Sequence, residues 1–354
     1  MAITRQKFLQ QSMALSAGTA VMGYWGIDSG WWGPPDLVTF DLHAHPGRFY
    51  RKGLSDYGGD AGVRKTIDEM NEAGLSGAFF STVVDTLVTR VRPEGVLPSR
   101  EFENGEAWKE YKRQITALRS LCRELPVRPS TTVGGLTDPS RNEVAAFFAC
   151  EGGDFLQGEG QLDEVYDDGV RSIQLVHYAP SPLGDLQTSP PQHNGLSPLG
   201  KEVVRKMNRL GMVIDVAHAS HKTVLDVAAI TNQPLILSHS ILKLDEDRPI
   251  GIRAITREHA KIIKSTRGVI GAWPSGFNSS FDDYIDNIMR LIDVVGVDYV
   301  GLGTDMDSNY KPVLDSYLQL GQWREALKAR GLTQDEVKKI AGGNVVRVLQ
   351  KVLK

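Results

Sequence analysis

The chain has 354 residues, 41% hydrophobic and 23% charged, which is an ordinary composition for one or two globular domains. The formal net charge of −3 gives no reason to expect a nucleic acid or an anionic membrane as a partner. The only two cysteines, Cys122 and Cys150, give no sign of a disulfide framework, and we expect Cys150 to be a small buried side chain within an apolar run.

The first 35 residues are predicted to be a leader and a Gly/Trp/Pro linker. Arg5 and Lys7 precede a stretch without charge, residues 8–27, as in export signals. TRQKFLQ is similar to the twin-arginine export pattern, although Gln6 stands at the second arginine's place. We expect an exported, periplasmic or membrane-associated protein whose membrane contact is made only by this leader. A frayed tail on a cytoplasmic protein is the alternative.

Eight short apolar runs alternate with helical patterns in the rest of the chain. The predicted strands are Leu37–Phe40, Leu75–Val84, Val144–Cys150, Val170–Val176, Met212–Val216, Leu235–Leu237, Val269–Trp273 and Tyr299–Gly303. The predicted helices are Ala61–Ala73, Glu106–Leu125, Leu162–Asp168, Pro198–Leu210, Lys222–Ile230, Thr256–Ser265, Phe281–Val295, Leu314–Ala329 and Thr333–Leu353. This alternation predicts an α/β fold, a (β/α)8 TIM barrel formed by residues 36–354 as one domain.

Three segments are predicted to lack regular structure. Thr86–Ser99 is expected to be an irregular insertion, and Leu242–Arg253 a charged loop. Ala179–Ser197 is rich in proline, glycine and serine, and a long loop of this kind beside a site is typical of a lid or a specificity element.

The stretch from residue 211 to 240 indicates where the chemistry lies. One apolar run ends just before His218, a helix follows, and a second apolar run ends at His239. A strand–helix–strand unit of this kind makes two parallel strands of one sheet. Both imidazoles then lie at the carboxyl ends of strands, where α/β folds bind their ligands. Two imidazoles there suit a divalent metal such as zinc.

Other polar residues follow predicted strands in the same register. They are His43, His45, Glu151, His177 and Asp305. Any one histidine is more often a surface or hydrogen-bonded side chain, but chance explains the whole set poorly. His43 and His45 are two residues apart, so they face one side of a strand and can share an ion. Glu151 precedes two glycines that allow close approach, so it can bridge two ions.

Several pieces of the sequence resemble the membrane dipeptidase family, peptidase family M19, from about Asp41 onward. They are EGG at Glu151, GLSPLGKEVVRKMNRLGMVIDVAHAS at Gly195–Ser220, LSHS at Leu237, GVIGAWP at Gly268, VGLGTDMD at Val300 and GGNVVRVL at Gly342. The resemblance implies a (β/α)8 barrel with two zinc ions. It also implies hydrolysis of dipeptides, including those with a D-residue on the C-terminal side.

The resemblance also implies a role for each polar residue. The first zinc would be held by His43 and His45, the second by His218 and His239, with Glu151 bridging the two. His177 would bind the substrate and stabilise the oxyanion, and Asp305 would shuttle the proton. The substrate carboxylate would be held by Arg253, with Arg248 as the competing candidate. The expected partners are a small dipeptide and, at most, a second copy of the chain in a homodimer.

One position departs from the family pattern. The sequence reads His43-Ala44-His45, where the family has His-x-Asp. Histidine is a competent zinc ligand, but this exchange removes one negative charge from the first site. The metal pair should then be more electrophilic and its water more acidic, and we expect the family activity either to be retained with an altered substrate preference or to be lost. Asp154 also stands where the family often has a histidine.

Two other functions stay open from the sequence. A related metal-dependent hydrolase of lactones, phosphoesters or N-acyl amino acids would also begin with His-x-His. Such enzymes often bridge their metals with a carboxylated lysine on the fourth strand, whereas this chain has His177 there and no lysine. The other candidate is a non-hydrolytic accessory homologue that binds little metal.

Overall fold

The computed structural model describes residues 38–354, except 94, 137–142, 245–247 and 249–250. The predicted leader and the start of the first predicted strand at Leu37 lie outside the described residues. Within the described ranges, none of the helices combines the length and the hydropathy that a membrane crossing requires.

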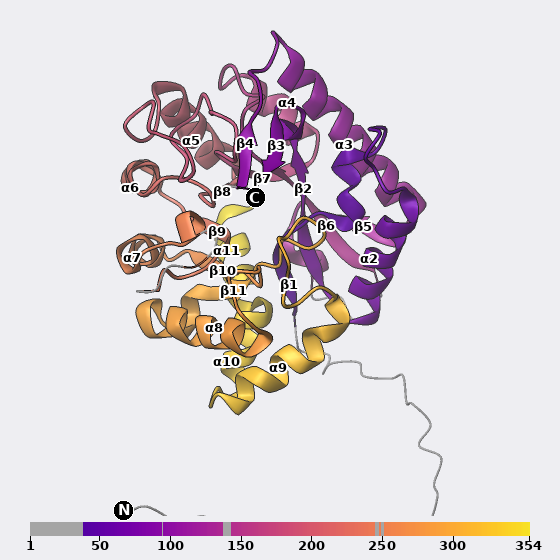
Figure 1. The fold of residues 1–354 in the computed structure, drawn as a ribbon, viewed down its shortest axis with the longest axis vertical. Coiled ribbons are helices and arrows are strands. Elements are labelled where there is room, and N and C mark those ends of the chain that lie inside the picture. The colour runs from indigo at the N-terminus through magenta and orange to yellow at the C-terminus, as the bar shows by residue number, and fades with distance from the viewer. Residues whose placement is uncertain (1–37, 94, 137–142, 245–247, 249–250) are drawn as a thin grey trace, which may run out of the picture. The chain divides into compact units, whose positions relative to one another are not determined.

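Eight parallel strands form a closed barrel, which confirms the predicted (β/α)8 fold (Figure 1). They are β1 (Phe40–Ala44), β2 (Gly77–Val83), β6 (Val144–Glu151), β7 (Val170–Gln174), β8 (Val213–Asp215), β9 (Ile236–Ser240), β10 (Val269–Ala272) and β11 (Val300–Leu302). Their order around the barrel is β2-β1-β11-β10-β9-β8-β7-β6. Pairing of β2 with β6, from Gly77 opposite Ala145 to Val83 opposite Glu151, closes the ring.

Ten α-helices are present in the described residues, close to the bounds that helical spacing predicts. They are α2 (Asp60–Glu72), α3 (Glu106–Glu124), α4 (Gln161–Asp167), α5 (Pro198–Leu210), α6 (His221–Ile230), α7 (Arg257–Ser265), α8 (Phe281–Val295), α9 (Leu320–Ala329), α10 (Gln334–Lys338) and α11 (Asn344–Val352). The side-chain oxygens of Ser197 and Ser220 accept from the backbone N–H three residues on, at 2.9 and 3.1 Å, and so cap α5 and α6.

The interior of the barrel is apolar at its amino-terminal end. One buried cluster joins the first residues of several strands, among them Phe40, Val213, Ile236 and Val269, to side chains of α11. Phe40, Phe79 and Phe147 meet there edge to face, with ring centroids 5.3–6.1 Å apart. A second, larger cluster lies between the strands and the surrounding helices. The amino-terminal end is therefore closed, and ligands must enter from the carboxyl end.

The first strand does not end at Phe40, as we predicted, but continues through Ala44. The polar Asp41 is tolerated in it because its carboxylate accepts from the backbone N–H of Thr304 at 2.9 Å and from the hydroxyl of Tyr317 at 2.7 Å. As a result, His43 lies within β1 and His45 directly follows it.

The predicted irregular insertion at Thr86–Ser99 is also wrong. A short 3-10 turn η2 (Val84–Leu87) leads into an antiparallel hairpin of β3 (Thr89–Arg92) and β4 (Gly95–Pro98). The side chain of Val91 is 83% exposed, so the hairpin lacks the alternation of buried and exposed residues that would mark it in the sequence. The three-residue strand β5 (Val127–Pro129), paired with the start of β6, was too short to predict.

The remaining short helical segments are mostly 3-10 turns. They are η1 (Pro46–Arg51), η3 (Val133–Gly135), η4 (Gly251–Arg253), η5 (Val297–Tyr299) and η6 (Tyr317–Gln319), with a π-turn η7 (Lys339–Gly343) between α10 and α11. The helix predicted from Leu314 therefore begins only at η6 and α9. The segment Ala179–Ser197 contains no helix or strand, which confirms the predicted loop.

Candidate metal centre

Five histidines and one glutamate meet at the carboxyl end of the barrel. His43 lies in β1, His239 in β9, and Glu151 is the last residue of β6, whereas the other three histidines follow strands. All six side chains are nearly buried, since none of these residues is more than 9% exposed. The members of the set are His43, His45, Glu151, His177, His218 and His239.

The Glu151 carboxylate is the centre of this group. Its Oε1 lies 3.3 Å from the Nε2 of His218, 3.4 Å from that of His43 and 3.7 Å from that of His239. Its Oε2 lies 3.2 Å from the Nε2 of His45. Glu151 thus belongs to two sets of three ligands, each with its ligand atoms within 4.8 Å of one another: one set with His43 and His45, one with His218 and His239. A carboxylate shared by two sets has the placement of a bridging ligand.

The ring nitrogens are disposed as metal ligands require. The Nδ1 of His45 lies 2.8 Å from the carbonyl oxygen of Ser81, so it carries a proton, and Nε2 is the nitrogen that faces the ligand set. The Nε2 atoms of His43 and His45 face each other at 3.0 Å, as do those of His218 and His239. Two facing lone pairs need a cation or a proton between them. The residues therefore fit divalent ions, and nitrogen and oxygen ligands suit zinc among others.

The pKa values of the two histidines of the second ligand set and of Glu151 are shifted in this cluster. Burial holds the pKa of both His218 and His239 well below the usual value, and the nearby charge of Arg253 lowers both further. Both rings are therefore neutral, as metal binding requires. Burial opposes the charge of Glu151, but the neighbouring imidazoles outweigh it and hold the pKa of that carboxyl well below its usual range.

His177 differs from the other four histidines in the partner of its Nδ1. Its Nε2 lies 3.4 Å from Oε1 of Glu151, while its Nδ1 donates to the carboxylate of Asp85 at 2.8 Å. Burial lowers its pKa, but the charges of Asp85 and Glu151 outweigh burial and raise the pKa to about 9. The ring is therefore a hydrogen-bond donor at neutral pH, as the predicted oxyanion contact requires, although that role stays a prediction.

Asp305 reaches the cluster and Asp307 does not. The Oδ1 of Asp305 lies 3.4 Å from the Nε2 of His45, whereas Asp307 accepts from the backbone of Gly47 and the hydroxyl of Thr66, both at 2.6 Å. Asp305 and His218 adopt left-handed backbone conformations, with φ of 53° and 63°. Such strain in non-glycine residues is often found at functional sites.

Arg253 lies beside the second set of ligands. It is 2% exposed, its guanidinium donates to the side chain of Gln187, and its Nη2 is 3.5 Å from the Nε2 of His239. The competing candidate, Arg248, pairs with Asp283 and donates to the carbonyl of Phe277 at 3.2 Å. The geometry therefore favours Arg253 as a substrate contact.

Comparison with known proteins decides the family. The model of the membrane dipeptidase family, peptidase family M19, matches residues 36–354. The chain belongs to this family. It is therefore an enzyme of the hydrolase class, and its family implies a metal cofactor and a peptide substrate.

Relatives named as dipeptidases are similar to the chain. An uncharacterized dipeptidase of Schizosaccharomyces pombe is 31% identical over 311 residues, 80% of this chain and 71% of that protein. Dipeptidase tcpJ of Claviceps purpurea is 32% identical over 196 residues, 52% of this chain and only 45% of tcpJ. A metallopeptidase structure from Rhodobacter sphaeroides, liganded with a phosphinate mimic of the dipeptide L-Ala-D-Ala, has a TM-score of 0.74 at 21% identity. The superposition covers 89% of this chain and 99% of the Rhodobacter sphaeroides chain.

Three polar residues near the site were not assigned a role from the sequence. Asp85 follows β2 as the other site residues follow their strands, so its position was a usable signal. Gln187 lies in the long loop and gave no signal. Asp154 was noted only as a departure from the family. Both of its carboxyl oxygens are buried without a hydrogen-bond partner in the described part of the chain, and burial raises its pKa well above the usual range.

The long loop is fastened beside the site. The carboxylate of Asp185 accepts from the backbone of Gln192 and Gly195, both at 2.7 Å, and from that of His193 at 2.9 Å. The backbone N–H of Gln187 donates to the carbonyl of His218 at 2.8 Å. These bonds favour a fixed specificity element over a mobile lid.

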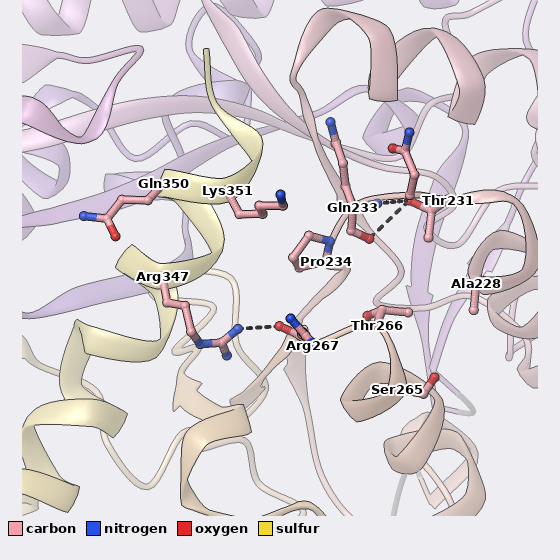
Figure 2. A pocket seen from close by; sticks show the side chains of 11 residues that line it. Ala228, Thr231, Gln233, Pro234, Ser265, Thr266, Arg267, Arg347, Gln350 and Lys351 are labelled. Carbon is pink, nitrogen blue, oxygen red and sulfur yellow. Dashed lines mark hydrogen bonds between the residues drawn. The ribbon is translucent and has the colours of Figure 1, made fainter.

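A cavity of about 700 Å³ lies at the other end of the barrel (Figure 2). Its lining includes residues 231–234, which precede β9, and residues 265–267, which precede β10. Figure 2 shows Arg347 donating to the carbonyl oxygen of Arg267 at its edge. No histidine, cysteine, aspartate or glutamate lines it, so its lining offers no set of metal ligands.

Proposed function

We propose that the chain is a binuclear zinc dipeptidase that hydrolyses the peptide bond of dipeptides. The observation that carries this proposal is the shared position of Glu151 in two sets of ligands, one with His43 and His45 and one with His218 and His239. Family membership and the dipeptide mimic in the Rhodobacter sphaeroides structure support a dipeptide as the substrate.

The metal ligands would be the four histidines of the two sets, with Glu151 shared. Two zinc ions there would supply a Lewis acid for the substrate carbonyl and a water acidified enough to be a nucleophile at neutral pH. The low pKa of Glu151 and the neutral rings of His218 and His239 favour cations at these positions. Because imidazole replaces a carboxylate at His45, the first site carries one negative charge less than the family pattern.

Three residues outside the ligand sets complete the site. His177 donates from Nε2 to the oxygen of the amide carbonyl, on which negative charge develops during attack. Asp305, 3.4 Å from His45, accepts a proton and passes it to the leaving amine. Arg253 pairs with the C-terminal carboxylate of the substrate through charged hydrogen bonds. A dipeptide has both groups that these residues recognise, an amide and a free carboxylate.

The His-x-His start favours a second candidate, a hydrolase of lactones, phosphoesters or N-acyl amino acids. The three residues after β7 are Leu175, Val176 and His177, so this position offers no lysine for carboxylation. Glu151, which both ligand sets share, would bridge the metals instead, and this favours the dipeptidase.

A hydrolysis screen tests the proposal. L,L- and L,D-dipeptides are compared with a lactone, a phosphotriester and an N-acyl amino acid, each with and without a chelator. We expect chelator-sensitive hydrolysis of dipeptides and about two zinc ions per chain by elemental analysis. If the lactone, the phosphotriester or the N-acyl amino acid were hydrolysed and the dipeptides were not, the proposed substrate class would be wrong. No turnover together with almost no zinc would support a non-hydrolytic accessory protein.

A further inference from the structure

Asp85 holds the turn that carries His177. This fully buried residue lies in η2, directly after β2, and is 92 positions from His177 in the sequence. Its Oδ1 accepts from the Nδ1 of His177 at 2.8 Å. Its Oδ2 accepts from the backbone N–H groups of Tyr178 at 3.0 Å and Ala179 at 2.9 Å. One carboxylate therefore fixes both the ring and the backbone of this turn.

The other four imidazoles have different partners at Nδ1. That of His45 faces a backbone carbonyl at 2.8 Å, and those of His43 and His239 face the hydroxyl of Ser238 at 3.3 and 3.1 Å. The Nδ1 of His218 has no hydrogen-bond partner among the described residues. None of these four rings is held at Nδ1 by a carboxylate among the described residues, so none has the fixed orientation that Asp85 gives to His177.

The His177 ring faces a carboxylate at each nitrogen. Asp85 accepts at Nδ1, and Oε1 of Glu151 lies 3.4 Å from Nε2. Nε2 is the nitrogen that faces the metal centre. Among the five rings, His177 is the one whose Nδ1 is held by a carboxylate. The contact with Asp85 therefore fixes which edge of this ring is turned toward the site.

We propose that Asp85 is a positioning residue that holds His177 in the orientation in which its Nε2–H meets the substrate oxyanion. This inference deepens the proposed function and rests on it. Asp85 reaches the substrate only through His177.

The test compares Asp85→Asn with Asp154→Asn in the zinc-loaded enzyme. Both variants replace a buried carboxyl near His177, but only Asp85 bonds to the ring. We expect Asp85→Asn to lower kcat about 10²–10³-fold, the usual effect of losing one oxyanion donor, with KM and zinc content little changed. Its affinity for a phosphinate dipeptide mimic, which presents a tetrahedral oxyanion, should fall by a similar factor. Asp154→Asn should change neither quantity.

A double-mutant cycle separates positioning from a general structural effect. If Asp85 acts through His177, then Asp85→Asn adds almost nothing to His177→Ala. Independent, additive losses in kcat, or an unchanged affinity of Asp85→Asn for the phosphinate, would overturn the inference. Failure of the proposed function would show differently, as an absence of dipeptide turnover in the unmodified enzyme.

A spectroscopic measurement does not depend on the folding of Asp85→Asn. NMR of the histidine-labelled, zinc-loaded enzyme with bound phosphinate should show one strongly deshielded Nδ1 proton, as a hydrogen bond to a carboxylate gives. That signal should be absent from His177→Ala. Its absence from the unmodified enzyme in this complex would overturn the inference.

Discussion

Replacing Glu151 by glutamine should remove metal binding while preserving the fold. Glutamine has nearly the same shape, but the change removes the one negative charge that lies 3.2–3.7 Å from the Nε2 atoms of all four proposed histidine ligands. Two unit charges about 4 Å apart interact by about 4 kcal/mol at an effective dielectric constant of 20. Since about 1.4 kcal/mol is tenfold in affinity, each divalent ion should bind at least about 10³-fold more weakly.

Zinc titration of metal-free protein, followed by calorimetry, measures this change. Asp168→Asn is a matched control, because Asp168 is also a buried carboxylate but hydrogen-bonds to Tyr111 and Lys112 and precedes β7, at the opposite end of the barrel. The control should bind two zinc ions like the unmodified protein, and both variants should keep cooperative unfolding. Zinc affinity or turnover of Glu151→Gln within a few-fold of the unmodified enzyme would refute the bridging role.

Three further predictions concern other side chains. In steady-state assays, Arg253→Met should raise KM for dipeptides about 10–100-fold, because a charged hydrogen bond contributes about 1.5–3 kcal/mol. KM for dipeptide amides, which lack the carboxylate, should not rise. Arg248→Met is the control and should change KM little. Asp305→Asn should lower kcat about 10²–10⁴-fold as proton transfer is lost, a loss that stopped-flow and steady-state rates would measure. Burial holds the pKa of His259 at about 4, against 6.5 for an unperturbed histidine. The unfolded chain therefore takes up the proton first, so His259 should lower stability at pH 5 relative to pH 7 by about 2 kcal/mol. Since the low pKa of His218 and His239 gives losses of the same sign, the prediction is a difference: in urea unfolding, the loss should be about 2 kcal/mol smaller in His259→Leu than in the unmodified protein. An unchanged KM for dipeptides in Arg253→Met, or a rise of KM that is equal for acid and amide substrates, would contradict the first expectation. Full kcat in Asp305→Asn would contradict the second, and the same pH dependence in His259→Leu the third.

Local signals explain what the sequence predicted well. The apolar runs before His218 and His239 end where the strands end, and parallel strands bring their carboxyl ends together. Ser197 caps α5 and Gly211, with φ of 75°, ends it, as their residue types indicate. The arrangement of the ligands can therefore be predicted largely from the positions at which the strands end.

Contacts between distant segments explain what the sequence did not predict. Asp41 remains in β1 only because Thr304 and Tyr317 satisfy its carboxylate, and neither is near it in the sequence. Gln187 meets Arg253 across 66 positions, from a loop with no periodic pattern. The export leader and the homodimer stay predictions.

The most direct test of the account is diffraction data at the zinc absorption edge from crystals of the zinc-loaded enzyme. We predict two zinc ions at the carboxyl end of the barrel, both bound to Glu151, one also to His43 and His45 and the other to His218 and His239. Anomalous peaks elsewhere, a single ion that Glu151 does not contact, or no ion at this end would contradict the central claim.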